Sequence, residues 1–382
     1  MDSRKPLKPG TKLQTNDGRT YIILREMDRG ATSIVYEGAR EGESIHAKTG
    51  ENTERVIIKE CYPIGLNLKR NSNGTLSCTA EAFIKFANAQ INFDKRLLLE
   101  KRLHNKKGLT NFSTTVIDFA ESNNSKYLIM DVRDGETFEE YISNHRQTIS
   151  LWDVVFPIYL LALVVSEYHK EFLILDIKPE NFLLTFIDGH PHNIEFFDVG
   201  SVIEKNNIKK DMVLSCSPKW AAPELLSRDD YEQINEKTDI YGIGATLFWA
   251  IMGRNPDSRE FLHTGRYDFN SSDCIECVKT ANEVVIRKIS KIFDHTLDSF
   301  QDARYDSAQQ LAEKIKDLLH EFILDKADEE ILIALAKTDD KINKLKDEVT
   351  VIGEKVLGLE EKMSEALGTR TASSRINNLL PV

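Results

Sequence analysis

The sequence predicts an α+β chain in which short strands come first and most of the helices follow. Strand-like apolar runs gather in the first 130 residues, at 21–24, 33–36, 56–59 and 127–130. A long helix is expected at about 80–103, and strong helical patterns return at 151–170 and 281–322. Such separation of strand-rich and helix-rich regions along the chain is typical of an α+β architecture.

Composition sets the first limits on function. The chain has 382 residues, 41% of them hydrophobic, which suffices for one large or two ordinary domains with a substantial core. Its net charge of −11 argues against nucleic acid or an anionic membrane as a partner. The N-terminus lacks the apolar core of a signal peptide, and the apolar run 154–165 is too short to span a bilayer. We therefore expect a cytoplasmic protein.

Cysteine usage agrees with a reducing compartment, because cysteine is sparse and odd in number. Cys274 and Cys277 form a CxxC pair with no second pair beside it. We interpret them as two ordinary thiols, in preference to half of a zinc site or a redox pair.

The N-terminal part begins with a hairpin region, residues 1–20, whose Asp17-Gly18 is a turn signal. The strands at 21–24 and 33–36 then flank a short turn that holds Gly30. A polar loop is expected at 65–80, before the first long helix.

The most informative stretch is a short polar loop between two apolar flanks, Leu173 to Leu184. Asp176 is able to accept a proton, Lys178 to neutralise an anion, and Asn181 to bind a hard cation through its amide oxygen. A scaffold that presents charged groups at a cleft uses loops of this kind. The less favoured alternative, taking the stretch alone, is a chance proline-containing turn after a buried helix.

The motifs that follow remove most of that ambiguity. Phe197-Asp198-Val199-Gly200 comes next, and then Ala222-Pro223-Glu224. This order resembles the protein kinase signature of a catalytic loop, D-F-G and A-P-E. The chain is identified as similar to the eukaryotic-like (Hanks-type) Ser/Thr protein kinases, and to their bacterial cytosolic members in particular. The resemblance covers about the first 320 residues.

The resemblance implies a bilobal kinase fold over residues 21–324. An N-lobe with an antiparallel sheet and one helix would reach to about residue 132, and a mostly helical C-lobe would occupy 133–324. Lys178 followed by Pro179 is similar to the Ser/Thr-kinase form of the catalytic loop.

For the nucleotide, the resemblance implies ATP held by positions in the N-lobe and the hinge. Expected binding residues are Gly30, Val35, Lys59, Met130, Asp131 and Arg133. Lys59 would hold the α- and β-phosphates and pair with Glu100. Two of the three glycine slots of the family's loop hold Asp28 and Ser33 instead, and Ile57 replaces a small alanine, which predicts a tight pocket.

For catalysis, the resemblance implies that Asp176 orients the substrate hydroxyl and accepts its proton, while Lys178 stabilises the γ-phosphate. Asn181 and Asp198 would hold Mg²⁺ or Mn²⁺.

The family sequence H-R-D appears here as Ile174-Leu175-Asp176, the pattern of a non-RD kinase. Leucine cannot pair with an activation-loop phosphate as arginine does. Ser215 and Ser217 are possible phosphosites, and we expect their replacement by Ala to leave activity largely intact. Structural roles are expected for an ion pair of Glu224 with Arg304 and for Asp239, which begins a buried helix.

Beyond about residue 325 the pattern changes. Apolar residues recur over 335–366 with the alternating spacing of a coiled coil, although two glycines interrupt them. A coiled coil or long amphipathic helix is expected over 325–368 and a disordered tail over 369–382. The helix would pair with a second copy, giving a homodimer or other self-association, or would fold back onto the kinase.

Three functions remain in view. The first is a Mg-ATP-dependent Ser/Thr kinase that phosphorylates protein hydroxyls and itself. The second is a pseudokinase or scaffold, favoured by the altered glycine loop and by Ile57. The third is phosphoryl or nucleotidyl transfer to another acceptor.

Overall fold

A computed structural model describes residues 2–41, 55–104, 116–132, 135–196, 200–205, 208, 214, 216–257 and 267–325. The chain divides into two compact units, residues 1–319 and 320–382. The elements that position the candidate site all belong to the first unit.

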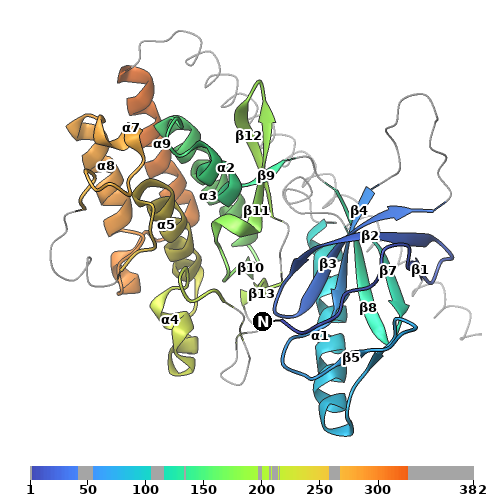
Figure 1. Cartoon of the computed structure of the whole chain (residues 1–382). Helices are drawn as coiled ribbons and strands as arrows, with labels where there is room; N and C mark the ends of the chain where they lie inside the picture. Colours follow the sequence, from blue (N-terminus) through green and yellow to red (C-terminus); the bar gives the residue numbers. More distant parts are fainter. Residues whose placement is uncertain are drawn as a thin grey trace, which may run out of the picture. The chain divides into compact units, whose positions relative to one another are not determined.

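The N-terminal region is built around a six-stranded antiparallel sheet with the strand order β1-β2-β3-β4-β8-β7 (Figure 1). The strands are β1 (Lys12–Gln14), β2 (Thr20–Arg29), β3 (Ser33–Arg40), β4 (Arg55–Cys61), β7 (Val116–Ser122) and β8 (Ser125–Asp131). Every strand run expected from the sequence lies in this sheet. Asp17 and Gly18 lie between β1 and β2, and Gly18 has the positive φ of 87° that such a turn favours.

The expected polar loop at 65–80 contains a small hairpin. Its strands β5 (Lys69–Arg70) and β6 (Leu76–Ser77) pair antiparallel across a turn at 71–75, where Asn71 exchanges backbone bonds with Gly74 and Thr75. The sequence did not suggest these strands because each is only two residues long.

The first long helix, α1 (Ala80–His104), matches the expected range. Its buried residues Phe86, Phe93 and Leu97 belong to the same apolar core as Ile58 of β4 and Leu128 of β8. The helix therefore covers one face of the sheet, as Figure 1 shows.

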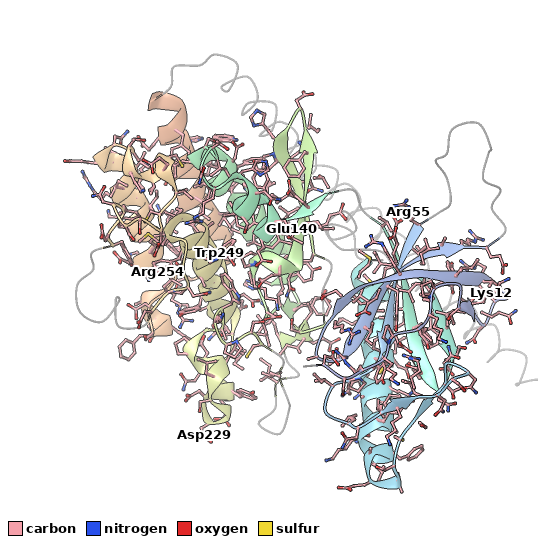
Figure 2. The ribbon with its side chains drawn as sticks, viewed as in Figure 1. Lys12, Arg55, Glu140, Asp229, Trp249 and Arg254 are labelled. Carbon is pink, nitrogen blue, oxygen red and sulfur yellow. The ribbon has the colours of Figure 1, made fainter. Side chains whose placement is uncertain are left out.

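The C-terminal region is mostly helical. Its helices are α2 (Phe138–His145), α3 (Leu151–Tyr168), α4 (Pro223–Leu226), α5 (Glu236–Met252), α7 (Glu276–Lys279), α8 (Glu283–Asp294) and α9 (Ala308–Asp325). Helix α2 starts with a capping box. The Thr137 hydroxyl accepts the Glu140 N–H, and the Glu140 carboxylate accepts the Thr137 N–H. Figure 2 labels Glu140 in this helix and Trp249 in α5. The ring of Trp249 packs edge-on against that of Trp220, with 5.8 Å between the ring centres.

Helix α3 lies at the centre of this region and packs on α5 and β12. Its length and composition would allow it to cross a bilayer, alone among the helices of the described ranges, yet 61% of it is buried inside the fold. A core helix has these properties.

Short strands frame the polar loop found in the sequence. Strands β9 (Glu136–Thr137), β11 (Phe182–Ile187) and β12 (His190–Phe196) form one small sheet, and β10 (Phe172–Leu173) pairs with β13 (Ile203–Glu204). The loop runs from β10 to β11 and contains one turn of 3-10 helix, Pro179–Asn181. Strands β10 and β11 thus hold the two ends of the loop.

Candidate active site

Asp176 lies at the centre of a cluster of polar side chains. Its Oδ1 accepts the backbone N–H of Ser217 at 2.8 Å, and its Oδ2 accepts the Asn181 amide at 3.1 Å. Lys178 Nζ is 3.2 Å from the same Oδ2 and donates to Ser217 Oγ at 2.8 Å. The side chains of Asp176 and Lys178 keep 15% and 21% of their exposure, so both remain accessible to a substrate. The cluster is therefore a fixed carboxylate beside a fixed cation.

Asn181 is oriented by Asp176. Its Nδ2 donates to the Asp176 carbonyl at 2.8 Å as well as to the carboxylate, so its amide oxygen faces the opposite side. An amide oxygen is a ligand that Mg²⁺ accepts, and the site fits a hard cation in this respect. Asp198, the other predicted ligand, lies outside the described residues. In the part of the chain that the structure describes, no group of three or more His, Cys, Asp and Glu residues offers another metal site.

The backbone before Asp176 is held from helix α5. Asp239 accepts the N–H of Ile174 on Oδ2 and the N–H of Leu175 on Oδ1, both at 2.8 Å. Leu175 has a φ of 65°, a left-handed conformation that costs a β-carbon-bearing residue about 1–2 kcal/mol. The two bonds to Asp239 stabilise this turn. This turn fixes the position of the Asp176 backbone. Asp239 therefore has the structural role that the sequence suggested.

His169 is the third partner of Asp239. Its Nε2 lies 2.9 Å from Asp239 Oδ2, and its side chain is buried behind the loop. His169 contacts Asp239, and none of its described hydrogen bonds reaches the polar cluster around Asp176. His169 is therefore a buried partner of Asp239 behind the catalytic loop.

Leu175 points into an apolar cluster that includes parts of the activation segment, residues 200–222. Leu173, Ala221, Leu225, Tyr231 and Ile234 form the buried cluster with it, and Ile203, Ile208, Leu214 and Cys216 pack against them. Burial raises the pKa of the Cys216 thiol, and the nearby Asp176 charge raises it further. The position of the family arginine is thus occupied by a hydrophobic contact.

Four of the predicted nucleotide-binding residues lie on the N-terminal sheet, namely Val35, Lys59, Met130 and Asp131. Lys59 is 6% exposed on β4 and pairs in register with Val35 of β3. Met130 is 2% exposed on β8, where it pairs with Ile57. Adjacent strands therefore bring Val35, Lys59 and Met130 onto neighbouring positions of one sheet.

The altered glycine loop is a tight hairpin end. The β2–β3 ladder continues to the pair Arg29–Ile34, so Asp28 is part of a strand, opposite Val35. Gly30 begins the turn, and Ser33 is buried at the start of β3. The two substituted glycine slots are strand positions that need no positive φ, which explains why Asp and Ser fit there.

Several predicted positions lie outside the described residues. They are the Glu100 side chain, Arg133, Ser215 and everything beyond residue 325, which includes the coiled-coil region and the tail. Asp131 ends strand β8 and is partly buried.

The predicted structural ion pair is present. Arg304 donates from Nη1 to Glu224 Oε1 at 2.8 Å and from Nη2 to Oε2 at 3.1 Å. Burial alone would raise the pKa of Glu224, but the Arg304 guanidinium outweighs burial and the net shift of the pKa is downward. The guanidinium also lies 5.0 Å from the Tyr241 ring centre. This pair ties the end of the activation segment to the chain before α9.

Two contacts of the site were not predicted from the sequence. The side chain of Ser217 bonds to Lys178, and Arg4 bonds to the carbonyls of the glycine loop. The sequence offered Ser217 only as a possible phosphosite. No local pattern marks the contact of Arg4 with the loop, because Gly30 and Ser33 are 26 and 29 residues away.

Comparisons with known proteins agree with this geometry. The family model described as protein kinase domain matches residues 72–329, which is more than half of the chain. The chain therefore belongs to the protein kinase family.

The more similar relatives are Ser/Thr and myosin light chain kinases. Myosin light chain kinase 3 of Rattus norvegicus is 26% identical over 182 residues, covering 46% of this chain and 22% of the relative. Serine/threonine-protein kinase ULK3 of Rattus norvegicus is 26% identical over 208 residues, covering 50% and 43%. The chain thus spans less than half the length of these relatives.

A solved structure titled "PpkA-294 apo form" has the same fold. It aligns with a TM-score of 0.58 at 19% sequence identity and covers 82% of this chain and 100% of that chain. The bilobal architecture predicted from the sequence is confirmed by this likeness and by the family match.

Proposed function

We propose that the chain is a serine/threonine protein kinase that transfers the γ-phosphate of ATP to protein hydroxyls. The observation that carries this proposal is the cluster in which Asp176 lies 3.2 Å from Lys178 while both bond to Ser217. A binding module has no chemical need for an accessible carboxylate and ammonium fixed in this way. The retained Lys59 and Asn181 support the same conclusion.

The reaction joins a substrate hydroxyl oxygen to the γ-phosphorus and breaks the bond to the oxygen that leaves with ADP. Asp176 orients the hydroxyl and receives its proton. Lys178 neutralises charge on the transferred group, and Ser217 keeps the ammonium in place. Lys59 positions the α- and β-phosphates from β4. A bound Mg²⁺, with Asn181 and Asp198 as its protein ligands, would supply further charge neutralisation.

The test uses ATP labelled at the γ- or the α-phosphate, with wild type and Asp176→Asn. We expect γ-label on Ser or Thr with wild type and a loss of about 10²–10⁴-fold in Asp176→Asn, because general-base contributions are of that size. No label in either protein would point to the pseudokinase or scaffold. Label from the α-position would point to nucleotidyl transfer.

We also propose that the chain is cytoplasmic and associates with a second copy through residues 335–366. The apolar heptad spacing there supports pairing, and pairing would raise the local concentration of one kinase near another. Light scattering of the full chain and of a chain ending at 325 tests this. A dimer for the first and a monomer for the second are expected, and equal masses would refute the pairing.

A further inference from the structure

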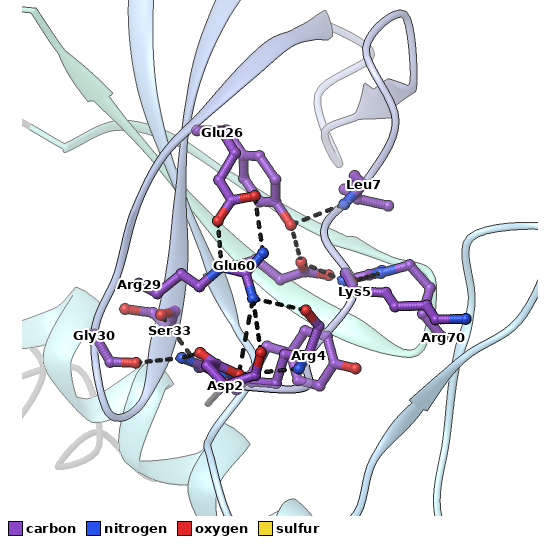
Figure 3. A network of polar contacts seen from close by, with 12 residues as sticks. Asp2, Arg4, Lys5, Leu7, Glu26, Arg29, Gly30, Ser33, Glu60 and Arg70 are labelled. Carbon is purple, nitrogen blue, oxygen red and sulfur yellow. Dashed lines mark hydrogen bonds and ion pairs between the residues drawn. The ribbon is translucent and has the colours of Figure 1, made fainter.

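An N-terminal strap, residues 2–8, runs along the sheet and ends beside the glycine loop (Figure 3). The strap, the glycine loop and Lys59 all precede residues 72–329, the region that the kinase family model matches. Its contacts fall into two groups, an anchor to the buried core and a set of bonds to the loop.

The anchor is built on Leu7 and Glu60. Leu7 is 3% exposed in the sheet core, and its N–H donates to the Tyr36 hydroxyl at 3.0 Å. That hydroxyl donates to the fully buried Glu60 at 2.7 Å. Arg70 pairs with Glu60 and also donates to the Lys5 carbonyl at 2.7 Å. The strap is therefore linked on both sides of Pro6, through Tyr36 and Arg70, to Glu60, the residue that follows Lys59.

Arg4 makes the contacts to the loop. Its guanidinium donates to the Gly30 carbonyl at 2.8 Å, to the Ser33 carbonyl at 3.3 Å and to the Tyr62 carbonyl. The side chain is 7% exposed, so water does not replace these bonds readily. Gly30 and Ser33 flank the turn between β2 and β3, and Arg4 therefore bridges both sides of the turn.

Two other residues hold Arg4 in place. Asp2 accepts both Nε and Nη2 of Arg4, which lowers the pKa of Asp2 to about 2. Arg29, the last residue of β2, donates to the Arg4 carbonyl at 2.8 Å. The guanidinium is thus charge-balanced and its backbone is attached to the strand that leads into the loop.

With the bonds of Arg4, all the carbonyl groups of the turn accept hydrogen bonds. The Ala31 carbonyl accepts the Ile64 N–H at 2.9 Å, and the Thr32 carbonyl accepts the Tyr62 N–H at 3.1 Å. All four carbonyls from Gly30 to Ser33 are therefore bonded to the strap or to residues 62–64. In a trans peptide the C=O and the following N–H point in opposite directions. The N–H groups of the turn are then directed to the other side, as in backbone sites that bind anions.

We infer that Arg4 is a positioning residue for the nucleotide loop, which orients the turn so that its N–H groups meet the phosphates of ATP. This inference rests on the proposed function for its ligand. Arg4 would hold in one orientation a turn whose flanking glycine slots hold Asp28 and Ser33 in this chain. No contact between Arg4 and the nucleotide is involved.

The experiment compares wild type with Arg4→Ala for transfer kinetics and for binding of Mg-ADP by calorimetry. A positioning role predicts that the KM for ATP and the Kd for Mg-ADP both rise by about tenfold, the size of a lost charge-assisted hydrogen bond. The kcat should stay within about twofold, because Asp176 and Lys178 are untouched. Amide exchange at residues 30–34 should become faster.

Two further variants keep the inference testable if Arg4→Ala does not fold, and a third variant is the matched control. Arg4→Lys keeps the charge without the planar fork and should give an intermediate rise in KM. Asp2→Asn keeps Arg4 but loosens it and should also raise KM. Lys8→Ala, an exposed change on the same strap, should match wild type.

The outcomes separate this inference from the kinase function. Unchanged KM and Kd in Arg4→Ala, or a fall in kcat alone, would overturn the positioning role while leaving the kinase intact. If wild type binds Mg-ADP without transferring phosphate and Arg4→Ala weakens that binding, the positioning role stands and the kinase proposal fails. A wild type that binds no nucleotide would refute both.

Discussion

At the scale of single residues, Ser217 joins the activation segment to the catalytic loop. Its N–H binds Asp176 and its hydroxyl binds Lys178, so both groups of the proposed chemistry depend on one residue. The sequence suggested Ser217 as a possible phosphosite whose replacement by Ala would be tolerated. These contacts change that expectation for Ser217, since alanine would remove the hydroxyl that accepts the Lys178 ammonium.

The residue-scale prediction concerns Ser217→Ala. We expect kcat to fall by about tenfold or more, because a hydrogen bond to a charged group contributes about 1.5–3 kcal/mol. Ser217→Thr keeps the hydroxyl and should retain most of the activity. For Ser215→Ala, little change is expected. Steady-state kinetics on a protein substrate would measure all three, and full activity of Ser217→Ala would show that the Lys178 bond is dispensable.

At the scale of elements, the catalytic loop depends on helix α5 and on an apolar contact. Asp239 holds the N–H groups of Ile174 and Leu175, and the Leu175 side chain is 4% exposed among activation-segment residues. In a kinase with arginine here, a phosphate on the activation segment completes the contact. In this chain burial of apolar surface takes that place, so we expect the described part of the segment to keep its order without a phosphate.

Leu175→Arg tests this view at the element scale. The change removes a buried leucine and places a charge in the apolar cluster, so the free energy of unfolding should fall by roughly 3 kcal/mol or more. Leu175→Met conserves volume and should cost less than about 1.5 kcal/mol. Urea unfolding measures both. Phosphatase treatment of wild type should leave kcat unchanged; a large loss would mean that the segment does depend on a phosphate.

At the scale of the whole molecule, the Glu224–Arg304 pair joins segments that are 80 residues apart. Both side chains are buried, at 4% and 3% exposure, and Glu224 also accepts the Thr238 hydroxyl at 2.9 Å. Breaking a buried pair leaves the remaining charge without compensation, which costs about 3–5 kcal/mol. The pair therefore bears on the stability of the entire C-terminal region.

Glu224→Gln should lower the free energy of unfolding at pH 7 by about 3–5 kcal/mol. The folded-state pKa of Glu224 is below its ordinary value of 4.5, so its contribution is present above that pH and is lost as the pH falls through the folded pKa. The gap between wild type and Glu224→Gln should thus narrow in acid. Urea unfolding from pH 7 to pH 3 checks this, and a constant gap would contradict it.

The sequence by itself determined the order of the elements and most of the chemistry. The spacing of Asp176, Lys178 and Asn181 within one loop, the strand that ends near Lys59, and the helices α1, α3 and α5 follow from local patterns of polarity. Such patterns suffice because the residues of one strand, helix or loop are close in space whatever the rest of the chain does.

Only the tertiary structure decided which distant groups meet. Lys178 and Ser217 are 39 residues apart, Leu175 and Asp239 are 64 apart, and Arg4 and Gly30 are 26 apart. No local periodicity records these pairs, because they form when the packing of the core brings separate segments together. The buried core around Leu7 and Glu60 therefore determines that Arg4 reaches the glycine loop, and α5 determines the conformation from which Asp176 acts.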